Sequence, residues 1–199
     1  QKIPCVLVNS YSDKLPSVLS DNRKGAYLAG RYLIEHGHKT VALLAGVRSY
    51  LSNQERTAGF LQAFQEEGLS IPPELILETG SWLYDAAEKV CLNFFNTYTG
   101  EMPTALFAFN DRLATGAINA ICKTGRTVPD DVSVIGYDNL GYYNIISPRI
   151  TTVETHIEAI SESTVMHMIW QLNNGSCLPV KVLTPVEVIS GETVRSLLC

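Results

Sequence analysis

Short runs of consecutive apolar residues alternate along the chain with longer segments in which an apolar residue recurs every three or four positions. The clearest runs are 41–45, 105–109 and 132–135. Four or five consecutive apolar residues predict a strand that is buried on both faces, as in a parallel sheet. The recurring pattern between the runs predicts amphipathic helices. The resulting order, β-α-β-α-β-α-β-α-β-β-α-β-β, predicts an α/β fold with a mostly parallel sheet.

Helix start and stop signals place the helices between these strands. Asp21-Asn22 can cap a helix that ends at Gly37. Ser52 and Glu55 have the spacing of a capping box at the start of the next helix. The remaining helices are expected at about 84–96, 112–123 and 157–172, and the remaining strands at 6–8, 75–77, 151–153, 180–184 and 186–189. Residues 1–20 are expected to contribute one strand.

Polar residues stand at the ends of three of the predicted strands. Asn9, Asn110 and Asp138 each follow a predicted strand. Open parallel sheets bind ligands in the crevice beyond the carboxyl ends of their strands, so these positions predict a small-molecule site. Other interpretations stay open, because Asn110 can cap the following helix and Asp138 can form a turn. As a ligand residue, the Asp138 carboxylate would accept two hydroxyl hydrogen bonds from a polyol such as a sugar.

Two further residues lie at strand-to-helix junctions. Arg56 is in the first turns of the helix that follows the 41–45 run, which places it near the mouth of the crevice; the alternative is a solvated side chain. Trp82 follows the 75–77 strand, where its ring can stack on the apolar face of a ligand ring. The alternative for Trp82 is a place in the core.

Charge and motif content exclude several classes of protein. The net charge is −5 and no basic run is longer than Arg23-Lys24, which is unlike a nucleic-acid surface. No apolar run reaches the 18 or so residues that a membrane span needs, and the start has no signal-peptide pattern. The nucleophile elbow, the dinucleotide fingerprint and the phosphate-binding loop are all missing from the sequence. We therefore expect a non-enzymatic protein without a cofactor.

The cysteines and histidines do not form a metal site. The five cysteines are widely spaced, so we expect free thiols, mostly buried, and a cytoplasmic location. None of the four histidines has a partner at ligand spacing, so no metal is expected. The chain begins at Gln1 and enters a strand almost at once, which is typical of a segment of a longer protein.

An aromatic and apolar cluster, Tyr142, Tyr143 and Ile145, lies in an irregular segment. Exposed aromatic residues commonly anchor protein interfaces, so the cluster predicts a homodimer interface. The alternative is that these residues fold back onto Pro148.

Several blocks in order along the chain resemble the lactose/galactose repressor family. The most specific is the string Val128-Pro129-Asp130-Asp131-Val132-Ser133-Val134-Ile135-Gly136-Tyr137-Asp138-Asn139. The others are the Gly-His and strand block at 34–46, the Arg-x-x-Gly-aromatic motif at 56–60, the Pro-Thr-Ala to Asn-Asp block at 103–111, and Pro148 with 150–153.

This resemblance implies a two-lobed fold of the periplasmic-binding-protein type, with three strands crossing between the lobes. Residues 1–20 and 154–183 would form part of the N-terminal lobe, which would be incomplete. Residues 21–153 and 184–199 would form the C-terminal lobe. The family's effector contacts fall on positions that match Asn9, Arg56, Trp82, Asn110 and Asp138, although an Asp is common where this chain has Asn9.

The resemblance also implies a function. We expect the effector-binding and dimerisation part of a transcriptional regulator that senses a sugar or similar metabolite, and that contacts operator DNA only through a headpiece outside this sequence. A periplasmic sugar receptor of a transporter has the same fold and is the alternative. A glycosidase-like enzyme is a third possibility. The unclustered cysteines and the 128–139 string favour the regulator.

Overall fold

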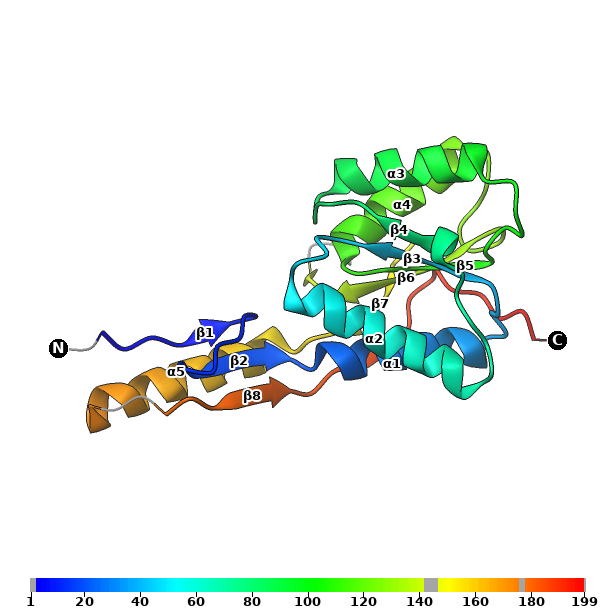
Figure 1. Cartoon of the computed structure of the whole chain (residues 1–199). Helices are drawn as coiled ribbons and strands as arrows, with labels where there is room; N and C mark the ends of the chain where they lie inside the picture. The colour runs from blue at the N-terminus through cyan, green and yellow to red at the C-terminus, as the bar shows by residue number, and fades with distance from the viewer. Residues whose placement is uncertain (1–2, 142–146, 176–177, 199) are drawn as a thin grey trace. The chain divides into compact units, whose positions relative to one another are not determined.

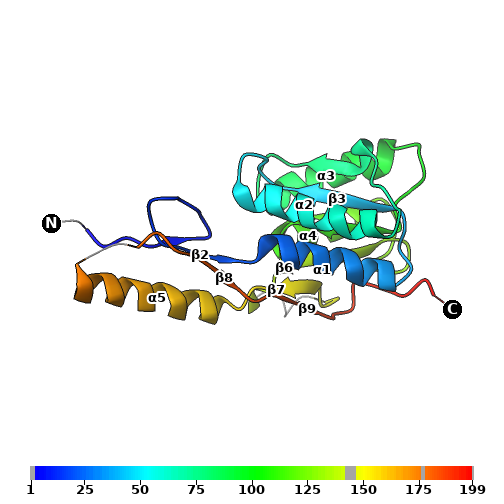
Figure 2. The ribbon, with the colours of Figure 1, turned by 60° about the horizontal axis from the view of Figure 1, so that its bottom comes forward.

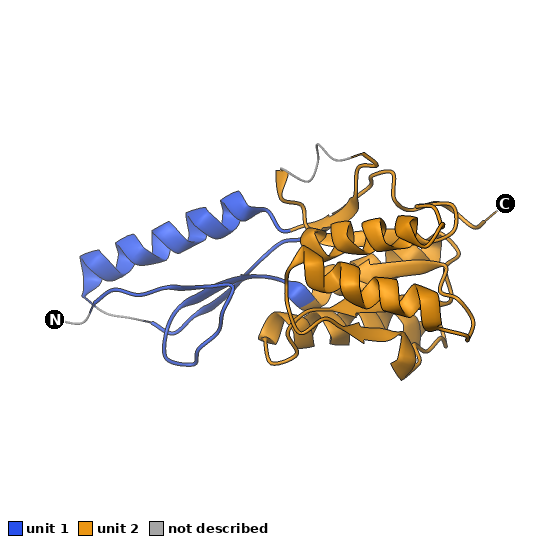
Figure 3. Ribbon diagram, turned by 90° about the horizontal axis from the view of Figure 1, so that it is seen from above, with its two compact units in different colours: residues 1–22, 155–186 blue, residues 23–154, 187–199 orange. Residues whose placement is uncertain are grey.

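The computed structural model describes residues 3–141, 147–175 and 178–198, and it divides into two compact units (Figure 3). Unit 1 comprises residues 1–22 and 155–186, and unit 2 comprises residues 23–154 and 187–199. These limits lie within a few residues of the lobe boundaries expected from the sequence. The identification of each unit with one lobe of the expected fold stays a prediction.

Unit 2 is built on a six-stranded sheet. Its strands are β3 (Val41–Ala45), β4 (Ile76–Glu78), β5 (Ala105–Ala108), β6 (Ser133–Asp138), β7 (Thr151–Glu154) and β9 (Glu187–Ile189), in the spatial order β4-β3-β5-β6-β7-β9. All neighbouring pairs are parallel except β7 and β9, which are antiparallel. Every residue of β3 and β5 is buried, as expected for strands that are covered on both faces.

Four helices cover this sheet. Helices α1 (Asn22–Glu35) and α2 (Leu51–Glu66) lie on one face, and α3 (Tyr84–Thr97) and α4 (Asp111–Lys123) lie on the other (Figure 1). A short 3-10 helix, η1 (Pro73–Leu75), precedes β4. The contact between α1 and α2 depends on Gly59, because a Cβ at that position would overlap the carbonyl oxygen of Arg23.

The connections reverse direction between β3 and β5. The chain leaves β3 through α2 on one face of the sheet, and it leaves the neighbouring β5 through α4 on the opposite face (Figure 1). Helices that diverge in this way open a crevice at the carboxyl ends of the two strands, which is where ligands bind in open α/β sheets. The fold of unit 2 therefore marks one edge of the sheet as the place to look for a site.

Unit 1 contains a smaller parallel sheet with one helix. Its strands are β1 (Leu7–Val8), β2 (Ser17–Ser20) and β8 (Lys181–Thr184), in the order β1-β2-β8. Helix α5 (Ile157–Asn174) runs alongside β2 and β8 (Figure 2). The Gln171 side chain links this helix to the first strand region, since it bonds both the backbone N–H and the carbonyl of Cys5 at 3.2 and 3.0 Å.

The predicted α/β class with mostly parallel sheets is confirmed, and two local predictions are wrong. Residues 1–20 form two strands rather than one, because the Val18-Leu19 run between two serines is too short to be recognised as a strand. The capping box is also wrong. Helix α2 already begins at Leu51 after Tyr50, no side chain caps it, and Ser52 is therefore a helical residue.

The cysteines are less uniformly buried than expected. Cys91 is buried, Cys5 is partly buried and Cys122 is exposed, and all three are free thiols. Burial raises the pKa of Cys91 to about 12, so this thiol stays protonated and behaves as a small apolar group. Within the described ranges, no helix is both long and apolar enough to span a membrane.

Candidate functional site

Arg56 lies on α2 at the carboxyl edge of the unit 2 sheet, with 9% of its side chain exposed. Its guanidinium lies 3.6 Å above the centre of the Tyr137 ring and donates a hydrogen bond to the carbonyl oxygen of Phe109. Its Nη2 is 3.3 Å from Oδ1 of Asp138. The interpretation of Arg56 as a solvated helix residue is therefore wrong, since the ring, the carbonyl and the carboxylate hold its charge at the sheet edge.

Asp138 ends β6 in a left-handed backbone conformation, with φ of 102°, and the next residue, Asn139, has φ of 51°. Its side chain is 28% exposed. Burial raises the pKa of the Asp138 carboxyl, because it disfavours the charged form, while the neighbouring Arg56 guanidinium acts in the opposite direction. The positive φ values agree with the turn interpretation, and this backbone presents the carboxylate to Arg56. The ligand role of Asp138 stays a prediction.

Asn110 is the N-cap of α4. Its Oδ1 accepts a hydrogen bond from the backbone N–H of Leu113 at 2.7 Å, which confirms the capping interpretation. Its Nδ2 lies 3.5 Å from the carbonyl oxygen of Trp82. The amide oxygen has a second lone pair, so capping and ligand binding are compatible. The ligand role of Asn110 stays a prediction.

Trp82 is partly exposed and lies against the end of β3. A Cβ on Gly46 would come within 2.5 Å of the indole ring, so the glycine allows the ring to approach the backbone closely. The rings of Trp82 and Tyr50 meet edge to face, with their centres 6.0 Å apart. Trp82 is therefore not a core residue, and its role as a stacking platform stays a prediction.

The remaining predicted residues are described separately from the unit 2 cluster. Asn9 follows β1 in unit 1, where it is exposed, has φ of 51° and donates its backbone N–H to the carbonyl of Val18 at 3.0 Å. Its role in binding stays a prediction. The three residues of the predicted dimer interface, Tyr142, Tyr143 and Ile145, lie outside the described residues.

One residue at the site was not singled out as a functional residue from the sequence. Asp111, the first residue of α4, is 2% exposed, and its Oδ1 accepts a 2.6 Å hydrogen bond from the Thr152 hydroxyl. Backbone N–H groups of Asn139 and Leu140 also donate to it. Burial is the main reason that the pKa of Asp111 rises to about 7. The sequence contained a signal, the Asn-Asp pair after an apolar run, but it identified only the asparagine as a ligand residue.

Comparison with known proteins places this arrangement in a family. The model of the periplasmic binding protein-like domain matches residues 31–194, which is most of the chain. The chain belongs to this family.

Relatives within the periplasmic binding protein-like family include transcriptional repressors. The chain is 31% identical to the probable HTH-type transcriptional repressor ExuR of Bacillus subtilis, over 99% of its own length and 59% of the relative. It is 33% identical to the HTH-type transcriptional repressor PurR of Pasteurella multocida, over 98% and 58%. The chain thus spans somewhat more than half the length of these relatives. The expected similarity to the lactose/galactose repressor family is confirmed.

Solved structures of family members support the same conclusion. The lac repressor dimer bound to operator and an anti-inducer superposes with a TM-score of 0.85 at 26% identity, covering 98% of this chain and 66% of the repressor chain. A LacI transcriptional regulator from Bacillus cereus subsp. cytotoxis gives 0.88 at 25% identity, covering 98% and 69%. The fold assigned from the sequence agrees with both.

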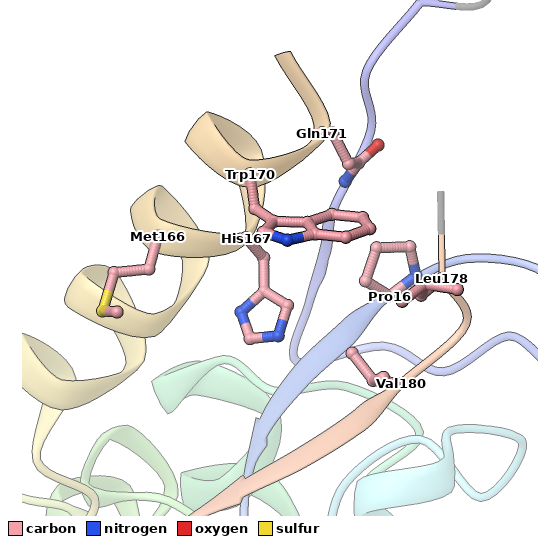
Figure 4. A pocket seen from close by; sticks show the side chains of 7 residues that line it. All are labelled: Pro16, Met166, His167, Trp170, Gln171, Leu178 and Val180. Carbon is pink, nitrogen blue, oxygen red and sulfur yellow. The ribbon is translucent and has the colours of Figure 1, made fainter. Parts of the chain in front are cut away.

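A cavity lies in unit 1, and its lining differs in chemistry from the Arg56–Asp138 cluster of unit 2. It is a cavity of about 280 Å³ between α5 and the strands of unit 1 (Figure 4), and its lining residues are Pro16, Met166, His167, Trp170, Gln171, Leu178 and Val180. Its polar side chains are engaged inside unit 1: His167 bonds the Ser163 carbonyl at 2.7 Å, and Gln171 bonds Cys5. A polyol needs several converging polar groups, so this apolar cavity does not suit a sugar.

The described residues hold no group of three or more His, Cys, Asp or Glu side chains with the geometry of a metal site. Buried His38 has a structural role instead. Its ring bonds the Thr104 hydroxyl at 2.9 Å and the Arg195 carbonyl at 3.1 Å, and burial lowers its pKa. This histidine ties the C-terminal segment to the sheet and is kept neutral.

If Trp82 forms the stacking surface of the site, a bound sugar should quench or shift tryptophan fluorescence, because the ring environment changes from water to ligand. Trp170 on α5 is the matched control, since it is the second of the two tryptophans. The signal should persist in Trp170→Phe and vanish in Trp82→Phe, measured by titration with a panel of sugars. The opposite pattern in the two variants would show that Trp82 is not at the site.

Proposed function

We propose that this chain is the effector-binding part of a transcriptional repressor that responds to a sugar or a similar small polar metabolite. In this proposal Arg56 and Asp138 are the polar anchors of the effector, Trp82 stacks on it, and Asn110 and Asn9 add hydrogen bonds. The protein acts without catalysing a reaction and without a cofactor. It works in the cytoplasm, where its DNA target is.

The observation that carries the proposal is the cluster at the switch between β3 and β5. Arg56 pairs there with Asp138 at 3.3 Å, and the Asn110 amide lies 3.5 Å from the carbonyl oxygen of Trp82, whose indole is partly exposed. Charged and amide groups beside an aromatic ring provide the hydrogen bonds and the apolar contact that sugar binding requires. The repressor relatives support a regulator rather than a transport receptor.

The mechanism we infer is a shift between two arrangements of the protein. An effector that binds one arrangement more tightly than the other changes the balance between them, and operator affinity in a separate DNA-binding region changes with it. The proposal includes a homodimer with Tyr142, Tyr143 and Ile145 at its interface. The lac repressor structure, described as a dimer on operator, supports this assembly.

A thermal-shift screen with sugars, nucleosides and phosphorylated metabolites tests the proposed function. A ligand at a hundredfold excess over its Kd should stabilise the chain by about 2.7 kcal/mol. For a chain of this size that corresponds to a rise in Tm of roughly 5–10 °C. In Arg56→Ala the rise should shrink to about half or less at the same ligand concentration, because the affinity is lower. A panel without any stabilising sugar would contradict the assignment of the effector class.

The 199-residue chain by itself should not bind DNA specifically. Its net charge is −5, so the release of counterions that drives non-specific binding contributes little. A gel-shift assay at low salt should show no sequence-dependent complex, with a basic DNA-binding protein as the positive control. Tight and sequence-dependent binding by this chain would contradict the proposal that DNA is contacted through a separate region.

A further inference from the structure

A buried carboxyl lies directly behind the ion pair of the candidate site. Asp111 is 2% exposed, whereas the Asp138 side chain is 28% exposed and faces Arg56. An isolated buried carboxylate is costly unless several hydrogen bonds satisfy it. Asp111 has such bonds on its carboxyl from a hydroxyl of β7 and from the backbone that follows β6.

The surrounding structure makes room for this carboxyl. Gly136 on β6 faces it, and a Cβ at that position would overlap Oδ1 of Asp111. Thr152 on β7 donates its hydroxyl to the same oxygen at 2.6 Å. Asp111 is also the first residue of α4, where the helix dipole favours a negative charge. Three elements, α4, β6 and β7, therefore meet at one carboxyl.

The backbone that Asp111 holds is the strained turn that presents Asp138. Asp138 and Asn139 both have positive φ, at 102° and 51°, a conformation that non-glycine residues rarely adopt without support. The N–H groups of Asn139 and Leu140 donate to Asp111, which supplies that support. The position of the Asp138 carboxylate against Arg56 therefore depends on a group that does not itself touch Arg56 in the described contacts.

We propose that Asp111 is a positioning residue of the candidate site: its ionised carboxyl locks the Asp138–Asn139 turn, and its protonation releases that turn and weakens effector binding. This inference rests on the proposed function for its consequence in binding. Its structural part, control of the turn by Asp111, stands on the geometry alone and is tested separately.

Protonation has a direct consequence because the neighbours of Asp111 are mostly donors. A protonated carboxyl gives up acceptor capacity and gains an O–H that needs an acceptor of its own. The Thr152 hydroxyl can turn to accept this O–H, but the two backbone N–H groups then donate to a neutral carboxyl, and their hydrogen bonds weaken because they are no longer charge-assisted. The pKa of about 7 puts this change near neutral pH. Binding that requires the ionised form should then weaken roughly tenfold between pH 8 and pH 6.

Other charged groups adjoin the same turn. Asp138 raises the pKa of Asp111 by repulsion between the two carboxylates, and Arg56 lies beyond Asp138. Glu154 on β7 is the register partner of Asp138 and accepts a hydrogen bond from the Asn139 side chain. The test must therefore separate the effect of Asp111 from that of the neighbouring carboxylates.

Amide hydrogen exchange, followed residue by residue by NMR, measures the stability of the Asp138–Asn139 turn in the absence of a ligand. In the wild-type chain, protection of the Asn139 and Leu140 amides, corrected for intrinsic exchange, should fall as the pH is lowered from 8 to 6. Asp111→Asn keeps the shape but removes the titration, so protection should be low and independent of pH. Persistence of the wild-type pH profile in Asp111→Asn would identify another titrating group and overturn the proposal.

Substitutions at two threonines provide a second test, which can be used if Asp111→Asn does not fold. Thr152 donates to the Asp111 carboxyl, whereas Thr115 donates to the Asp111 backbone carbonyl at 2.8 Å. Loss of the Thr152 hydroxyl removes a bond that favours the ionised form, so Thr152→Val should move the midpoint of the pH profile upward. Thr115→Val should leave the midpoint unchanged. Equal midpoints in all three proteins would contradict the proposal.

Sugar binding is the second readout, with the panel sugar that stabilises the wild-type chain most as the probe. Its affinity should fall roughly fivefold to a hundredfold in Asp111→Asn at pH 8, and the remaining affinity should not vary with pH. Undiminished affinity in this variant would overturn the positioning role. If no sugar binds the wild-type chain while the amide pattern is as expected, the proposed function fails and the control of the turn by Asp111 stands.

Discussion

Replacing Arg56 by alanine should weaken effector binding by roughly tenfold to over a hundredfold. The reason is the loss of a charged hydrogen-bond donor in a buried position, which typically costs about 1.5–3 kcal/mol. The change also leaves the Phe109 carbonyl and the Asp138 carboxylate without this guanidinium. Isothermal calorimetry with the sugar that gives the largest thermal shift measures the effect.

Arg31→Ala is the matched control for this experiment. Arg31 is also paired with carboxylates, Glu35 and Glu67, but it lies on the surface of α1, where an ion pair contributes little. Its removal should leave the affinity unchanged. Asp138→Ala should weaken binding as Arg56→Ala does. Unchanged affinity in both of these variants would remove the two residues from the site.

The sequence predicted the strands that are buried on both faces. Runs 41–45, 105–109 and 132–135 became β3, β5 and β6, because a central parallel strand has no solvent-facing side and is apolar at consecutive positions. Strand β2 was not predicted, because it contains no long apolar run. Only two of its residues are apolar, and hydrogen bonds with a strand more than 160 residues later in the chain, from Ser17 to Val180 and from Asp21 to Thr184, help define it. Non-local pairing of this kind leaves no local pattern.

The position of the candidate cluster was predictable from the sequence, but the contacts within it were not. The rule that ligands bind beyond the carboxyl ends of parallel strands placed Arg56, Asn110 and Asp138 at one edge. It could not show that Arg56 pairs with Asp138, because 82 residues separate them and the contact depends on how α2 lies on the sheet. The role of Asp111 was hidden for the same reason, since its hydroxyl partner Thr152 is 41 residues away.

Unit 1 differs from unit 2 in how its apolar surface is covered. Among the described residues, the exposed large hydrophobic side chains of unit 2 are Tyr50, Leu83 and Leu198. Those of unit 1 are far more numerous for a smaller unit and include Ile3, Val8, Tyr11, Ile157, Val165, Met166, Ile169, Trp170, Leu172, Leu178, Val180 and Leu183. A parallel sheet needs cover on both faces, and three strands with one helix leave apolar surface exposed.

The helix of unit 1 shows the effect most clearly. Val165, Ile169 and Leu172 are spaced by four and three residues on α5 and are 55%, 52% and 64% exposed. This spacing puts them on one face of the helix. Met166, one of the residues that line the 280 Å³ cavity beneath α5, is 69% exposed. Apolar surface of this extent usually marks a place where other protein packs.

Limited proteolysis of the 199-residue chain should therefore cut residues 1–22 and 155–186 early while a fragment within 23–154 resists digestion. Local opening needs less free energy where few apolar groups are buried, and unit 1 buries fewer of them. Mass spectrometry of the fragments over time measures the order of cutting. The described loops of unit 2, such as the one that contains Gly68, serve as an internal control. If exposure alone determined cleavage, these loops would be cut as fast as unit 1.

The alternative is that a second chain covers the apolar face of unit 1. Unit 1 would then be protected at high concentration and would become sensitive on dilution, and Val165→Glu with Ile169→Glu would restore sensitivity at all concentrations. Equal protection of both units in a chain shown by sedimentation to be monomeric would contradict both explanations. In that case the exposed side chains of α5 would not weaken unit 1, and the expectation that this part of the fold is incomplete would be wrong.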